Sequence, residues 1–88
     1  MQFRWNRWNA EHVQKHGITR DAAEFIVERA RRPFPEMIGE GKRYVAGQTA
    51  EGLYAQVIYL LDADGTVFII HARPLDDSEK RKFRRRAR

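Results

Sequence analysis

The chain has 88 residues, of which 42% are hydrophobic and none is cysteine. This length suits one small domain over residues 1–88, and the composition is that of a chain able to form a core. The lack of cysteine excludes disulfides, cysteine-ligated zinc and thiol nucleophiles, and no apolar stretch approaches the roughly 20 residues that span a bilayer. We therefore expect a soluble, cytoplasmic protein without a membrane partner.

The net charge of +5 is spread unevenly along the chain. Residues 1–32 carry seven Lys or Arg and four Asp or Glu, residues 33–70 carry two and five, and residues 71–88 carry eight and three. Basic segments on both sides of an acidic one indicate a polyanionic partner, either a nucleic acid or an acidic protein. The alternative is that the last arginines are only the solvated end of a helix.

The first half of the chain predicts a short strand, two helices and a loop. We expect a strand at Gln2–Trp5, a helix capped by Asn6 and running to about His16, a helix capped by Thr19 and ended by Pro33 and Pro35, and a loop at Pro35–Lys42. Asn and Thr side chains accept hydrogen bonds from the free N–H groups of a helix start. Gly17 suits the end of the first helix because glycine adopts positive φ without strain.

The second half predicts three strands and a final helix. We expect strands at Arg43–Gln48, Leu53–Leu61 and Thr66–Arg73, turns at Thr49–Gly52 and Asp62–Gly65, and a helix capped by Asp76 or Asp77 after Pro74. Short connections imply that consecutive strands are antiparallel neighbours. The prediction is an α+β fold with packed helices on a small, mostly antiparallel sheet, in the order β-α-α-β-β-β-α.

The first predicted helix carries two histidines suited to acid–base chemistry. At about 100° per residue, one face of this helix holds Trp8, Asn9, His12, Val13 and His16, and the opposite face holds Ala10, Glu11, Gln14 and Lys15. Histidine exchanges protons near neutral pH. The alternative is a half-buried pair whose ring nitrogens bind backbone or carboxylate groups.

A zinc site made by His12, His16 and His71 is the metal alternative. Glu11 precedes His12 instead of following it, so the H-E-x-x-H motif of metalloproteases is absent. The surroundings are cationic, which disfavours a divalent ion. We therefore predict no metal and no other cofactor.

The predicted strand Thr66–Arg73 ends with His71 and Arg73 on one face. Strand alternation predicts a core face of Phe68, Ile70 and Ala72 and an opposite face of Val67, Ile69, His71 and Arg73. The arginine fork suits a phosphate, and the alternative is a salt bridge with Glu79 or Asp76. Glu79 is either a general base held by Arg73 or an acid that complements the helix dipole.

Further cations, Arg43, Lys80 and Arg84, are candidates for substrate binding. Arginines and histidines with few carboxylates suit phosphodiester cleavage without a metal, since they bind the phosphate, stabilise the charged transition state and move protons. The sequence contains no Walker loop, no G-x-G-x-x-G and no nucleophile elbow, so nucleotide hydrolysis and serine hydrolase chemistry are unsupported.

Three segments resemble the BrnT family of bacterial toxins and its uncharacterised relatives. They are W-N-R-W-N-A-E-H-V-Q-K-H-G-I-T (Trp5–Thr19), R-Y-V-A-G-Q-T-A-E-G-L (Arg43–Leu53) and H-A-R-P-L-D-D-S-E-K-R (His71–Arg81). The resemblance implies a RelE-like fold and a type II toxin that cleaves RNA and arrests translation. The implied partners are RNA and a BrnA-type ribbon-helix-helix antitoxin, in a homodimer or a toxin–antitoxin hetero-oligomer.

The resemblance also assigns site residues. Lys15 and His16 match the family's Lys/Arg-His-Gly turn, Arg43 its hairpin arginine, and Arg73 and Glu79 its Ala-Arg…Glu ending. Together with the residue chemistry, this predicts a metal-independent endoribonuclease in which His16, helped by His12 or His71, moves protons. The alternative is a catalytically inert relative that binds nucleic acid or an acidic protein.

Overall fold

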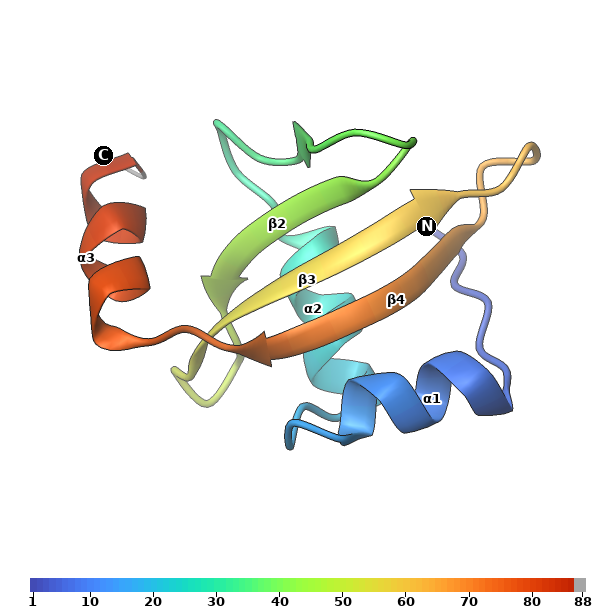
Figure 1. The fold of residues 1–88 in the computed structure, drawn as a ribbon, viewed down its shortest axis with the longest axis horizontal. Coiled ribbons are helices and arrows are strands. Elements are labelled where there is room, and N and C mark those ends of the chain that lie inside the picture. Colours follow the sequence, from blue (N-terminus) through green and yellow to red (C-terminus); the bar gives the residue numbers. More distant parts are fainter. Residues whose placement is uncertain (87–88) are drawn as a thin grey trace.

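The computed structural model describes residues 1–86, which form three helices and a four-stranded antiparallel sheet (Figure 1). The elements are α1 (Arg7–Gln14), α2 (Arg20–Glu28), β1 (Glu36–Met37), β2 (Arg43–Gln48), β3 (Tyr54–Leu61), β4 (Val67–Pro74) and α3 (Asp77–Arg86). The strands lie side by side in the order β1-β2-β3-β4. The predicted α+β class and antiparallel sheet are confirmed.

The predicted first strand is wrong. In Gln2–Trp5, only Phe3 forms a bridge, and it is parallel to Val67. The Arg4 N–H donates to the Val67 carbonyl, and the Val67 N–H donates to the Gln2 carbonyl, both at 2.8 Å. Pairing stops there because Asn6 already caps α1, so the backbone that follows is helical and cannot continue a strand.

Strand β1 lies in the segment that was predicted to be a loop. Within Pro35–Lys42, the residues of β1 pair with Tyr44 and Arg43 of β2. The observed order is therefore α-α-β-β-β-β-α, in place of β-α-α-β-β-β-α. A strand of two residues has no alternating pattern that a sequence could display.

Helices α1 and α2 begin at the predicted capping residues. The Asn6 side chain accepts from the Asn9 N–H, and the Asn9 side chain accepts from the Asn6 N–H. Thr19 accepts from the Ala22 N–H in the same way. Gly17 follows α1 with a φ of 82°, the conformation that favours glycine.

One face of the sheet packs against α2, which lies behind the strands in Figure 1. This face and the helices bury a continuous apolar core that includes Val13, Ile18, Ala23, Ile26, Val27, Val45, Val57, Tyr59, Val67, Ile69 and Ala72. Burial of this surface is the main force that holds the helices on the sheet.

An irregularity between β3 and β4 changes which residues face the core. Ile58 pairs with His71 but Tyr59 pairs with Ile69, so Ile70 is an extra residue in β4. The buried residues of β4 are Val67, Ile69 and Ala72. The predicted core face of Phe68, Ile70 and Ala72 is therefore wrong, because alternation shifts by one residue at the bulge.

Helix α1 covers the outer edge of β4, along which it lies in Figure 1. Its buried residues are Asn9, Ala10 and Val13, and Trp8 remains 50% exposed. Ala10 was predicted to lie on the opposite face of the helix from Asn9 and Val13, but it is buried together with them. Asn9 Nδ2 donates to the Ile69 carbonyl at 2.9 Å, so α1 provides a partner to a strand edge.

Candidate functional site

Two rows of side chains cross the sheet on the face opposite the core. The register aligns Tyr44, Ile58 and His71 in one row and Ala46, Gln56 and Arg73 in the next. Residues paired directly across antiparallel strands project from the same face. His71 and Arg73 therefore share this face with Tyr44 and Gln56, as alternation from His71 to Arg73 predicts.

Two histidines from different elements meet beside these rows. The ring centroids of His16 and His71 are 5.8 Å apart, in an edge-on arrangement. His16 is exposed and follows Lys15, the C-cap of α1, whereas His71 is half-buried. Burial, and then the nearby His16 and Arg73, lower the pKa of His71. His71 is therefore neutral at neutral pH and able to accept a proton.

Arg73 forms a two-pronged ion pair with Glu79. Its Nη1 and Nη2 donate to the two carboxylate oxygens at 2.8 and 2.7 Å, and Nη1 also donates to the Pro74 carbonyl. The salt-bridge alternative for Arg73 thus describes the observed contact. An arginine has five N–H donors, so the Nε–H and one Nη2–H remain for a ligand along the side of the guanidinium.

Glu79 also belongs to the start of α3. Its side chain accepts from the Asp76 N–H, and Asp76 accepts from the Glu79 N–H, which completes a capping box at the predicted Asp76. The hydrogen bond from Arg73, followed by that from the Asp76 backbone, lowers the pKa of Glu79 to about 2. A carboxylate of that pKa is a weak base, so Glu79 is suited to orienting Arg73.

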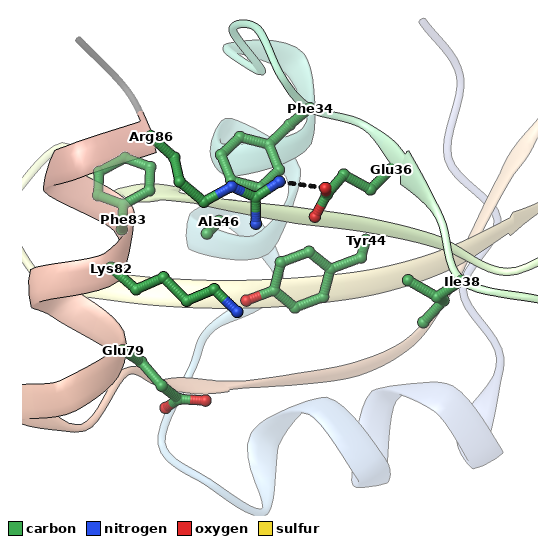
Figure 2. Close-up of a pocket in the computed structure, with 9 residues that line it drawn as sticks. All are labelled: Phe34, Glu36, Ile38, Tyr44, Ala46, Glu79, Lys82, Phe83 and Arg86. Atoms are coloured by element: carbon green, nitrogen blue, oxygen red, sulfur yellow. Dashed lines mark hydrogen bonds and ion pairs between the residues drawn. The ribbon is translucent and has the colours of Figure 1, made fainter.

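A hollow of about 220 Å³ adjoins this group between α3, β2 and the segment before β1 (Figure 2). Its lining residues are Phe34, Glu36, Ile38, Tyr44, Ala46, Glu79, Lys82, Phe83 and Arg86. Lys82 and Tyr44 point toward one another in Figure 2, and Arg86 is paired with Glu36. The hollow is therefore bordered by charged groups around an aromatic floor.

Tyr44 joins the hollow to the two rows. Its hydroxyl donates to Gln56 Oε1 at 3.0 Å. Burial, and then the negative charge of Glu79, raise the pKa of Tyr44, so its phenol stays protonated at neutral pH. Tyr44 therefore lines the hollow while its hydroxyl remains a hydrogen-bond donor to Gln56.

Three predicted substrate-binding cations have neighbours other than Arg73 and His71. Arg43 is on β2, on the sheet face that packs against α2. Lys80 lies 3.9 Å from the Asp77 carboxylate, and Arg84 lies over the Tyr54 ring at 5.2 Å. His71 is the predicted binding residue whose pKa the nearby Arg73 lowers.

The third histidine is held at the surface of α1. His12 Nδ1 lies 2.8 Å from the Trp8 carbonyl, and the ring centroids of His12 and Trp8 are 4.1 Å apart. His12 is exposed, so it does not form the half-buried pair with His16 that was one of the predicted alternatives. The structure brings together His16, His71, Arg73 and Glu79, whereas the His12 ring packs on Trp8 and is the weakest of the three positive groups that lower the pKa of His71.

Sequence reasoning missed Gln56, Tyr44 and Lys82 as site residues. Gln56 is 6% exposed and is the one amide in the apolar run of β3, which is a signal that could have identified it. Tyr44 follows Arg43 in the chain and was not among the predicted site residues. Lys82 carries no signal that separates it from the other cations of α3.

Within residues 1–86, no three His, Cys, Asp or Glu side chains are grouped so that they could hold a metal ion. None of the helices in this part of the chain has the length and apolar character needed to cross a bilayer. Comparisons with protein-family models, with curated proteins and with solved structures find no match to this chain. The BrnT resemblance therefore rests on the sequence motifs alone.

Replacing Glu79 with glutamine is expected to change the pH dependence of folding. Because the pKa of Glu79 is lowered from 4.5 to about 2 in the folded protein, its carboxylate contributes stability that is present above pH 4.5. That contribution is lost as pH falls toward 2. Urea unfolding should show wild type losing its advantage over Glu79→Gln across this range, whereas a difference that is constant with pH would contradict the assignment.

Proposed function

We propose that this protein is a metal-independent endoribonuclease and the toxin component of a type II toxin–antitoxin system. The observation that carries the proposal is the pair of imidazoles of His16 and His71, 5.8 Å apart, together with Arg73, which shares a sheet face with His71. Two imidazoles move protons, and an arginine edge binds phosphate oxygens.

The reaction assigns one role to each group. Neutral His71 accepts the proton of the ribose 2′-hydroxyl as its oxygen attacks phosphorus. The P–O5′ bond then breaks, and the His16 imidazole acts as the acid that gives a proton to the leaving 5′-oxygen. Arg73 stabilises the extra negative charge on the phosphoryl oxygens while Glu79 holds its guanidinium in place. The products are a 2′,3′-cyclic phosphate and a 5′-hydroxyl.

The sequence motifs support the RelE-like fold and the BrnA-type antitoxin as parts of this proposal. A small antiparallel sheet with three helices, as in residues 1–86, is compatible with that fold. The basic segments at both ends suit a polyanionic substrate. RNA is therefore the substrate, and the antitoxin is the partner that would mask these charges.

Arg73→Lys is the substitution that tests the phosphate-binding role. It keeps the charge but removes the planar fork, so RNA cleavage in EDTA should fall about 10²–10³-fold, as it does when one transition-state donor is lost. Arg4→Lys is a matched control, because Arg4 forms a similar two-pronged pair with Asp62 on another part of the surface. If Arg73→Lys and Arg4→Lys cleave RNA at the same rate, Arg73 does not bind the phosphate as proposed.

The second candidate is a catalytically inert relative that binds nucleic acid or an acidic protein. It is favoured by the ion pair in which Nη1 and Nη2 of Arg73 both donate to the Glu79 carboxylate, because these two donors are then not free to bind a phosphate. In that case, folded wild-type protein binds RNA with a steep salt dependence but leaves it intact, and the histidine and Arg73 variants bind equally well.

A further inference from the structure

A second concave region adjoins the hollow that contains Glu79. It is a cleft of about 400 Å³ bounded by the C-terminal end of α2, the segment that follows it, the end of β2 and Phe83 of α3. Phe34, Ala46 and Phe83 line both the cleft and the hollow. We call it the arginine cleft, after Arg29, Arg31 and Arg32.

The arginine cleft carries positive charge that the described residues leave unneutralised. No Asp or Glu lines it, and no carboxylate within residues 1–86 forms an ion pair with any of its three arginines. Arg4 and Arg73, by contrast, are each paired with a carboxylate. A concave surface with several free guanidinium groups attracts and binds an anion.

The cleft also offers a flat surface next to these charges. The Arg29 guanidinium lies over the Phe25 ring, 4.7 Å from its centroid. Unpaired bases stack on guanidinium planes as well as on aromatic rings, and single-stranded nucleic acid sites combine such surfaces with basic grooves. The amide of Gln48 lines the same cleft.

The unpaired edge of β2 suggests an alternative ligand for the cleft, a peptide that would pair with β2 as an added strand. Strand β1 pairs only with Arg43 and Tyr44, so Ala46–Gln48 has no strand beside it on that edge. This stretch is at the short limit of strand length, which gives a pairing peptide few backbone hydrogen bonds. Three arginines around it favour a phosphate over a strand.

We propose that the arginine cleft binds one nucleotide of a single-stranded RNA, with its phosphate on Arg31 and Arg32 and its base on the Arg29 guanidinium. Ala46, which lines the cleft, lies in the same row as Arg73 and two strands away from it. At the usual spacing between strands, the backbones of these two residues are about 10 Å apart. The cleft therefore holds a nucleotide close to the cleaved bond on the same RNA strand. The identity of the ligand as RNA rests on the proposed function.

Binding of a short 2′-O-methyl RNA, which lacks a reactive 2′-hydroxyl, tests this site without cleavage. Arg31→Gln/Arg32→Gln should weaken binding about tenfold, and it should reduce the slope of log affinity against log salt by about 0.7, the contribution of one single-strand phosphate contact. Arg7→Gln/Arg20→Gln removes the same charge from two exposed arginines elsewhere and should bind like wild type.

Each outcome distinguishes the cleft from the alternatives. Equal losses in the two double variants would mean that only net charge matters, which overturns the proposal. Binding of a poly-glutamate peptide that is as tight as RNA binding, and that is equally sensitive to Arg31→Gln/Arg32→Gln, would also overturn it in favour of an acidic protein. Cleft-dependent binding together with intact unmodified RNA would refute the nuclease and leave the nucleotide site standing.

Discussion

His71→Asn is expected to lower the rate of RNA cleavage by about 10²–10⁴-fold, the usual contribution of a general acid or base. His71 is the half-buried member of the imidazole pair, and its lowered pKa keeps it neutral. In wild type, activity should therefore persist to a lower pH than an ordinary histidine base allows, with the acid limb of the profile below about 6.5. Single-turnover cleavage across a pH series measures both effects.

His12→Asn provides the internal comparison for this prediction. Its ring packs on Trp8 and its Nδ1 lies 2.8 Å from the Trp8 carbonyl, so we expect less than about a threefold loss of cleavage. A larger loss for His12→Asn than for His71→Asn would reverse the assignment of the base. Circular dichroism of both variants establishes that each is folded.

Asn9→Ala is expected to destabilise the protein by about 3 kcal/mol. Asn9 is 0% exposed, and its Nδ2 donates to the carbonyls of Arg4 and Ile69 while its Oδ1 accepts from the Asn6 N–H. Alanine would leave these buried or half-buried backbone groups without partners, and each such loss costs about 1–3 kcal/mol. A domain of this size should lose more than about 10 °C in Tm.

Urea unfolding followed by circular dichroism measures the effect of Asn9→Ala. The matched variant is Gln14→Ala, which removes an exposed amide from the same helix and should change stability by less than about 0.5 kcal/mol. If the two variants unfold at the same urea concentration, Asn9 does not connect α1 to β4 in the way described.

Local features of the fold could be predicted from the sequence, whereas features that depend on distant pairing could not. The caps at Asn6 and Thr19 and the bounds of β2 follow from a few neighbouring residues, and the structure confirms them. The extra residue Ile70 arises from the pairing of β4 with β3, which no local pattern records. Strand β1 exists only because β2 offers it an edge.

The candidate site divides in the same way. Arg73 and Glu79 are six residues apart, so their possible pairing was visible in the sequence. Gln56 lies beside Arg73 only through the register of two strands, and Arg43 is directed to the opposite face by the same alternation. Spacing therefore placed His71 and Arg73 on one face but could not show which residues of the other strands share it.

The most direct test of the nuclease is the chemistry of the RNA ends that the wild-type protein leaves in EDTA. An end-labelled single-stranded RNA is incubated with purified protein, and its fragments are analysed by mass spectrometry. The proposed use of His16, His71 and Arg73 predicts a 2′,3′-cyclic phosphate with a 5′-hydroxyl and full activity without a divalent ion. A 3′-hydroxyl with a 5′-phosphate, a requirement for Mg²⁺, or intact RNA with folded protein would contradict it.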